Sequence, residues 1–290
     1  MDLLRSLILL KEESNTSAEV DKFLRKVAAD CRPFIDLNLD KRPVYRGIST
    51  FGTPPLEEFS KKRAHRTDRK ARNSDDRFIF KFNLMVQAVH GDVSDVRAKS
   101  VYCTPSFKEA DAYGEPAYLF PAGNVKILWS PQISDSTMDD HLITKHFIGH
   151  FADILDMDTI RDTDNRSLTD MGFIFADLGE HITTGELLSG SPSARKKFGE
   201  TISLSSPYNA LLKNVPDGAV FDAFVEAAKK TFHSLEYRIG DIASFKDALN
   251  QKKPPEIAII ESDGYYAIPV DAFGRLSYEE LFARIRGRAA

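Results

Sequence analysis

The spacing of hydrophobic positions changes along the chain and predicts helices at its start. Apolar side chains between residues 3 and 10 recur at helical intervals, and after a polar break at 14–17 the same spacing returns between residues 20 and 28. Such a stripe is typical of a helix that packs against a core. Residues 1–42 are therefore predicted to form N-terminal helices.

Shorter apolar segments follow, and they predict strands because proline, glycine or polar residues bound them. These segments lie at 43–49, 100–104, 117–120, 125–129, 256–260 and 265–270. The last two are joined by Ser262-Asp263-Gly264, which is typical of a tight hairpin turn. A short helix is predicted at 107–113, because Ser106 can cap its start, Glu109 stands three residues later and Gly114 can end it.

Of two further parts of the chain, one fits either a strand or a helix and the other predicts mostly helix and loop. Residues 77–98 fit a strand, since three phenylalanines alternate from Phe78 to Phe82, or a helix, since later apolar residues recur at helical spacing. Residues 132–253 predict helix and loop, with amphipathic helices at 221–232 and 242–249 and a polar loop at 189–207. We therefore expect an α+β fold in a single domain of residues 1–290, with residues 132–253 as a largely helical insertion.

The composition is ordinary for a globular protein, with 42% hydrophobic and 28% charged residues and a net charge of −4. No apolar run approaches the roughly 20 residues that a membrane span needs. Acidic residues flank the short apolar run at 7–10, which argues against a signal peptide. The two cysteines, Cys31 and Cys103, make no disulfide framework and fit a reducing compartment. We expect a cytoplasmic protein with no membrane partner.

The first predicted strand carries a positive charge in an apolar setting. Arg46 shares a face of this strand with Val44, and a lone buried charge is costly, so the guanidinium needs an anion. That anion is either a buried carboxylate in a structural ion pair or a phosphate held by bidentate hydrogen bonds. Gly47, the next residue, lets the backbone bend or approach a ligand closely.

Other candidate residues lie at the ends of two predicted strands. Thr104 and Ser106 stand at the chain reversal before the short helix, where small polar groups can meet a ligand. Glu256 stands at the start of an apolar strand. It is either a residue exposed at the strand end or a catalytic carboxylate. Glu261, at the predicted hairpin, is expected to be solvated.

The segment at 61–72 is strongly basic, with seven Lys or Arg residues and one Asp. It fits a solvated loop, a contact with nucleic acid or an acidic partner, or a lid over a phosphate-bearing ligand. Arg69 and Arg72 are the candidates for such a lid.

Aspartates and histidines gather between residues 135 and 158. His146 and His150 have the i, i+4 spacing of a zinc-binding HExxH motif, but the segment reads His-Phe-Ile-Gly-His and lacks the glutamate that would activate a water. We expect an acidic, solvated helix here and no metal site.

Three of these features together resemble the ADP-ribosyltransferase superfamily, including predicted transferases from bacteriophage genomes. Members carry an arginine on the first core strand, a Ser-Thr-Ser-like motif on the second and a catalytic glutamate on a later strand. The similar segments here are VYRGIS with Arg46, SVYCTPSFKEADAYG with Thr104 and Ser106, and EIAIIESDGYYAI with Glu256. The resemblance covers residues 43–131 and 254–272 and implies a split β-sheet core.

The resemblance implies an NAD-dependent mono-ADP-ribosyltransferase that releases nicotinamide and modifies a macromolecular acceptor, or an enzyme that hydrolyses NAD. NAD would be a substrate, since the chain has no Rossmann GxGxxG motif. Glu256 would be catalytic and Arg46 would bind the NAD phosphates, while Thr104 and Ser106 would order the strand and the ribose contacts. Tyr113 would stack on nicotinamide, unless it is a core residue.

The sequence departs from the arginine-specific members of that superfamily, which carry a second glutamate near the catalytic one. Pro254 and Ala258 occupy the positions two before and two after Glu256. This argues against an arginine side chain as acceptor and leaves other protein residues or a nucleic acid. A second hypothesis needs no catalysis: a binding protein that docks on nucleic acid or an acidic partner through the basic segment at 61–72.

Overall fold

The computed structural model describes residues 17–48, 76–91, 96–136, 138–157, 174–204, 215–272 and 276–288. The chain forms two compact units, and each takes residues from more than one segment. Unit 1 comprises Met1–His65, Val101–Ile127 and Ile239–Ala290, and unit 2 comprises Arg66–Ser100 and Leu128–Arg238. The predicted insertion at 132–253 thus differs from unit 2, which also contains residues 66–100, whereas residues 239–253 belong to unit 1.

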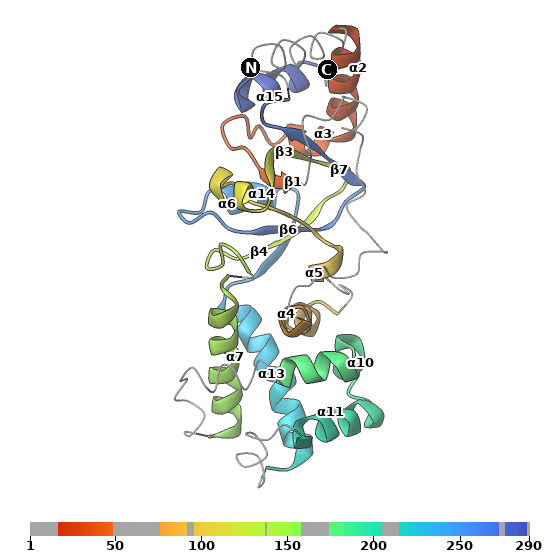
Figure 1. The fold of residues 1–290 in the computed structure, drawn as a ribbon, viewed down its shortest axis with the longest axis vertical. Coiled ribbons are helices and arrows are strands. Elements are labelled where there is room, and N and C mark those ends of the chain that lie inside the picture. The colour runs from red at the N-terminus through yellow and green to blue at the C-terminus, as the bar shows by residue number, and fades with distance from the viewer. Residues whose placement is uncertain are drawn as a thin grey trace, which may run out of the picture. The chain divides into compact units, whose positions relative to one another are not determined.

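The described chain is α+β, as predicted, with two antiparallel sheets. The first sheet has the order β1-β3-β7 and contains β1 (Tyr45–Ile48), β3 (Glu115–Ala122) and β7 (Gly264–Pro269). Helices α2 (Ser17–Asp30) and α3 (Arg32–Ile35) pack against β3, and α15 (Tyr278–Arg286) packs against α2 (Figure 1). The N-terminal helix predicted from the stripe at 20–28 is therefore confirmed as α2, whereas the stripe at 3–10 lies outside the described residues.

Aromatic side chains fill the core of unit 1. The ring of Phe120 on β3 contacts Phe34 edge-on, with 6.2 Å between ring centroids, and it stacks on Tyr278 at 6.1 Å. Phe120 and Phe34 are fully buried, and such pairs add about 0.5–1.5 kcal/mol beyond the area they bury. The core therefore ties the first sheet to helices from both ends of the unit.

The second sheet has the order β2-β6-β4-β5. It contains β2 (Val101–Cys103), β6 (Ile257–Glu261), β4 (Lys126–Trp129) and β5 (Arg238–Asp241). Three of its strands, β2, β4 and β6, were predicted from apolar runs, but β5 lies in a region predicted to be helix and loop. Its sequence, RIGD, offers too few apolar residues to predict a strand.

The predicted hairpin at 256–270 is wrong, because its two strands belong to different sheets. β6 pairs with β2, so that Cys103 lies opposite Ile257, whereas β7 pairs with β3 along its whole length. Between them the backbone N–H of Asp263 donates to the carbonyl of Ala122, 3.1 Å away, and Gly264 adopts φ 144°. The chain does change direction at residues 262–264, as predicted, but this bend carries it from the second sheet to the first.

Helix α13 (Asp217–Ser234) packs against two other long helices of unit 2, α7 (Asp140–Leu155) and α4 (Asp76–Val89). Figure 1 shows α7 and α13 running beside each other. Phe224 lies in the middle of this core, and its ring is 4.8 Å from Phe147, 5.4 Å from Phe175 and 5.2 Å from Phe198. α5 (Val96–Lys99), α10 (Thr184–Leu188) and α11 (Pro192–Leu204) complete the described helices of this unit, and α14 (Ser244–Leu249) belongs to unit 1.

The ambiguity at residues 77–98 is resolved as helix, because α4 covers residues 76–89. Its three phenylalanines are all buried, which shows why a period of two was visible in the sequence: α4 is buried on more than one face. It also buries Lys81, which is paired with Asp140 and Thr144 of α7.

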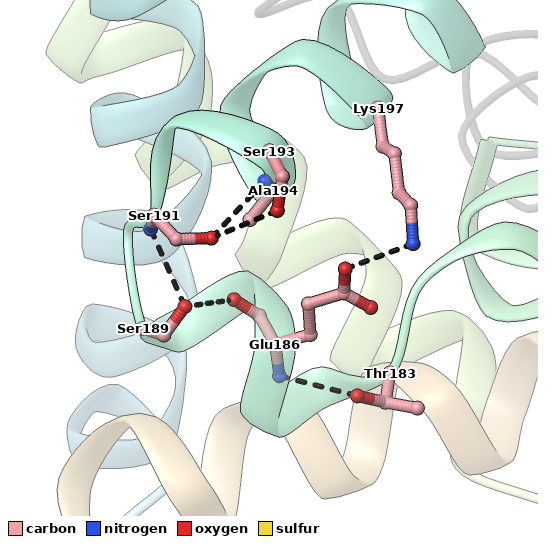
Figure 2. Close-up of polar contacts among 7 residues, drawn as sticks. All are labelled: Thr183, Glu186, Ser189, Ser191, Ser193, Ala194 and Lys197. Carbon is pink, nitrogen blue, oxygen red and sulfur yellow. Dashed lines mark hydrogen bonds and ion pairs between the residues drawn. The ribbon is translucent and has the colours of Figure 1, made fainter.

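The prediction of a polar loop at 189–207 is wrong, since α11 occupies most of that range. The serines that suggested a loop instead cap and join α10 and α11 (Figure 2). Ser191 accepts a hydrogen bond from the backbone N–H of Ala194, 3.2 Å away, and the Ser189 hydroxyl donates to the carbonyl of Glu186 at 2.6 Å. The carboxylate of Glu186 then pairs with Lys197 across the two helices at 2.8 Å.

None of the helices in the described ranges is both long and apolar enough to cross a membrane.

Candidate functional site

Arg46 lies in the middle of β1, where strand pairing places it opposite Ala117 of β3. Its Nη1 donates a hydrogen bond of 2.8 Å to the backbone carbonyl of Tyr102, and its Cζ lies 5.6 Å from the ring centroid of Tyr265. Both partners are neutral groups. The guanidinium is therefore fixed in direction by a carbonyl and an aromatic face, and these contacts leave its charge available to an anion.

Gly47 is explained by the packing of α6 (Phe107–Ala112) on β1. A Cβ at this position would lie 2.4 Å from the carbonyl oxygen of Ala110 and 2.8 Å from the Cβ of Tyr113. The close approach that the glycine permits is therefore to a helix of the same unit. A contact of Gly47 with a ligand stays a prediction.

Thr104 and Ser106 form the turn that leads from β2 into α6. The Ser106 side chain accepts a hydrogen bond from the backbone N–H of Glu109, which confirms it as the N-cap. The carboxylate of Glu109 does not close a capping box; it accepts a hydrogen bond of 2.8 Å from the Thr104 hydroxyl, which in turn accepts one from the N–H of Ser106 at 3.2 Å. The helix ends at Ala112, before Gly114, which has φ 138°.

The turn at 104–106 is tied to Arg46 through the backbone. Tyr45 and Thr104 exchange two hydrogen bonds, at 2.7 Å and 2.9 Å, and these join β1 of the first sheet to the residue that follows β2 of the second. Arg46 is therefore next in sequence to a residue that is directly paired with the turn.

Glu256 immediately precedes β6 and is half-buried, which differs from a simple exposed strand end. Because Cys103 lies opposite Ile257, Glu256 follows on at the end of β6 that is beside Thr104. Glu261, at the other end of β6, is exposed as predicted, and its carboxylate lies 3.2 Å from the ammonium of Lys126.

Strand pairing brings Arg46 and Glu256 into one neighbourhood, because Arg46 donates to the carbonyl of Tyr102 on β2, and β2 pairs with the start of β6, which Glu256 immediately precedes. Burial raises the pKa of Cys103 to about 12, the positive charge of Arg46 acts to lower this pKa, and the negative charge of Glu256 acts to raise it. We call Arg46, Glu256 and the turn at 104–106 the Arg46–Glu256 site; all of it lies in unit 1.

Two aromatic side chains of the α6 region are exposed beside this site. Tyr113, the C-cap of α6, is 58% exposed, and Phe107, its first residue, is 48% exposed. The alternative that Tyr113 is a core residue is therefore wrong. Phe107 also contacts the ring of Tyr45 edge-on, with 5.6 Å between centroids.

Sequence reasoning missed two residues that hold this site in place. Glu109, which orients the Thr104 hydroxyl, was visible as a cap residue but not as a partner of Thr104. Tyr265, beneath the guanidinium of Arg46, comes from a distant strand, and no local pattern could connect the two.

The lid candidates Arg69 and Arg72 and the whole basic segment at 61–72 lie outside the described residues. Within the ranges that the structure describes, no group of three or more His, Cys, Asp or Glu side chains is arranged to hold a metal ion.

Comparison of the chain with protein-family models, with curated proteins and with solved structures found no match.

Proposed function

We propose that this chain is an NAD-dependent ADP-ribosyltransferase that releases nicotinamide and transfers ADP-ribose to a macromolecular acceptor, or to water. The observation that supports this most directly is the grouping of Arg46, the turn at 104–106 and Glu256 in unit 1, from three segments distant in sequence. A fixed cation and a half-buried carboxylate around a hydroxyl-bearing turn fit a ligand that carries phosphates and a sugar.

Arg46 would bind the diphosphate of NAD. Its Nη1 is occupied by the carbonyl of Tyr102, and its remaining N–H groups provide the planar donors that suit phosphate oxygens. The ring of Tyr265 would keep the guanidinium plane from turning when the ligand leaves.

Thr104 would act toward the ligand as a hydrogen-bond acceptor. Its one hydroxyl proton goes to the carboxylate of Glu109, and one lone pair receives the N–H of Ser106. A hydroxyl oxygen has two lone pairs, so one remains to accept from a ribose hydroxyl or a carboxamide N–H.

Glu256 would stabilise the positive charge that develops on the ribose. The bond from ribose C1′ to the nicotinamide nitrogen breaks, and its electron pair leaves with nicotinamide, which becomes neutral. The acceptor nucleophile, or water, then forms a bond to C1′ and loses a proton. A carboxylate in a partly desolvated site stabilises the oxocarbenium-like transition state and can hold the ribose 2′-hydroxyl.

The residues two positions before and two positions after Glu256 indicate which kind of acceptor the enzyme would modify. Ala258 is buried and Pro254 has no functional group, so neither neighbour supplies the second carboxylate that would activate an arginine. We therefore expect the acceptor to be a protein side chain other than arginine, a nucleic acid, or water.

The test is nicotinamide release from NAD by the wild-type chain and by Glu256→Gln, in the presence of cell extract as a source of acceptor. We expect the substitution to slow release about 100-fold or more, since it removes a charge that acts on the transition state. Glu261→Gln is the matched control, because Glu261 is an exposed carboxylate at the opposite end of the same strand. Equal rates for wild type and Glu256→Gln, or no release with any acceptor, would overturn the proposal.

A further inference from the structure

Two histidines of unit 2 converge on one serine hydroxyl. His146 and His150 are one helical turn apart on α7, and Ser234 is the last residue of α13. Nδ1 of His146 lies 3.0 Å and Nε2 of His150 lies 3.1 Å from the hydroxyl oxygen of Ser234. All three side chains are half-buried, so solvent ions can reach them.

The separations between these donor atoms are close to those of a metal site. In a tetrahedral zinc site with bonds of about 2.0–2.1 Å, neighbouring ligand atoms stand about 3.3 Å apart. The two nitrogen–oxygen separations, 3.0 Å and 3.1 Å, are within a few tenths of an ångström of that edge. The two imidazole rings are 6.3 Å apart at their centroids, and each presents a nitrogen to the same hydroxyl oxygen.

We propose that His146, His150 and the Ser234 hydroxyl bind one divalent transition-metal ion of the Zn²⁺, Cu²⁺ and Ni²⁺ class, with water completing the coordination. Imidazole nitrogen is a preferred ligand of these ions and a poor one for Mg²⁺ or Ca²⁺. The site needs no third histidine or carboxylate, because Ser234 supplies an oxygen from a second helix.

The electrostatic surroundings set the expected strength of binding. Burial lowers the pKa of both histidines, helped by Lys145 at His146 and by His146 and Lys230 at His150, while Asp153 opposes the change at His150. Because Lys145 and Lys230 repel a cation, we expect binding of an ion to be weaker than in a site without neighbouring lysines.

Without a metal, the same atoms satisfy one another by hydrogen bonds. The Ser234 hydroxyl also lies 3.2 Å from the carbonyl of Thr231, to which it donates, so both imidazoles can donate N–H groups to its oxygen. A neutral imidazole can move its proton to the other ring nitrogen and free the converging nitrogens for an ion. The experiment must therefore separate metal binding from this network.

Asn and Gln variants distinguish metal binding from the hydrogen-bond network. The amide nitrogen of His146→Asn replaces Nδ1, and that of His150→Gln replaces Nε2, so both variants keep a donor to Ser234 but lose the imidazole ligand. His141→Asn is the matched control, because His141 is an exposed histidine of the same helix.

The untagged, chelator-stripped protein is titrated with Zn²⁺ against a chromophoric chelator at pH 7.5, and its Cu²⁺ complex is examined by electron paramagnetic resonance. We expect one ion per chain, hyperfine coupling to two nitrogens, and affinity about tenfold or more weaker in His146→Asn and His150→Gln but unchanged in His141→Asn. Absence of binding at about 100 μM metal, or full binding by the His146→Asn/His150→Gln double variant, would overturn the proposal. NAD is absent from these measurements, so the result is independent of the proposed transferase activity.

Discussion

A single residue, Cys103, makes the free energy of unfolding depend on pH in the alkaline range. Burial raises this pKa from 9.0 to about 12, so the unfolded chain loses the thiol proton before the folded chain does. Stability from this group is complete below pH 9 and is lost as the pH rises toward 12. At pH 10, one pH unit above the unfolded pKa, the loss is about 1 kcal/mol.

Cys103→Ala removes this titration. We expect the free energy of unfolding, measured in urea at pH 8 and pH 10, to fall less in the variant than in wild type by about 1 kcal/mol. Tyrosines that also titrate at high pH are common to both proteins and cancel in the comparison. Equal losses in both proteins would contradict the assignment of this pH dependence to Cys103.

Residues at chain reversals were predictable one by one, whereas their partners were not. Ser106 was identified as an N-cap from spacing alone, because capping is local and depends on residues within one helical turn. The partner of Arg46 could not be identified, since Tyr265 stands more than two hundred positions later and reaches Arg46 only through the pairing of β7 with β3.

At the scale of elements, the packing of α6 on β1 depends on Gly47. In Gly47→Ala the new methyl group would meet backbone atoms of Ala110 and Tyr113, which cannot move aside without shifting the helix. We expect a loss of stability of about 1–3 kcal/mol in urea unfolding. The control is Gly149→Ala in α7, where a Cβ meets nothing within 4 Å, and there we expect a small gain.

A shift of α6 would also move the turn at 104–106, because Ser106 caps that helix. Nicotinamide release, if the proposed function holds, should therefore fall in Gly47→Ala and not in Gly149→Ala. Unchanged stability of Gly47→Ala would contradict the tight packing of α6 on β1.

Element types were predicted where one face of a helix or strand is buried. The stripe of α2 and the amphipathic pattern of α13 follow from that one-sided burial. α4 buries side chains on several faces, so its pattern fitted two periods. β6 and β7 are almost wholly buried and carry no sign of which strand each pairs with, and so the local turn signal led to the wrong hairpin.

At the scale of the whole chain, division into two units could not be read from the sequence. Unit 2 draws on 66–100 as well as 128–238, and no proline-rich or glycine-rich linker marks these boundaries. The division depends on which distant segments pack together, such as α4 against α13. That is a property of tertiary packing, which local periodicity does not encode.

Each unit has its own aromatic core, and this predicts which unit a substitution in one core destabilises. Phe224 is fully buried among rings of unit 2, and Phe120 among rings of unit 1. Replacing either by alanine should cost about 3–5 kcal/mol, because the cavity cannot close. Hydrogen exchange followed by mass spectrometry should then show faster exchange in α7 and α13 for Phe224→Ala, and in β3 and β7 for Phe120→Ala. Faster exchange of both units in each variant would instead mean that the two cores unfold as one cooperative structure.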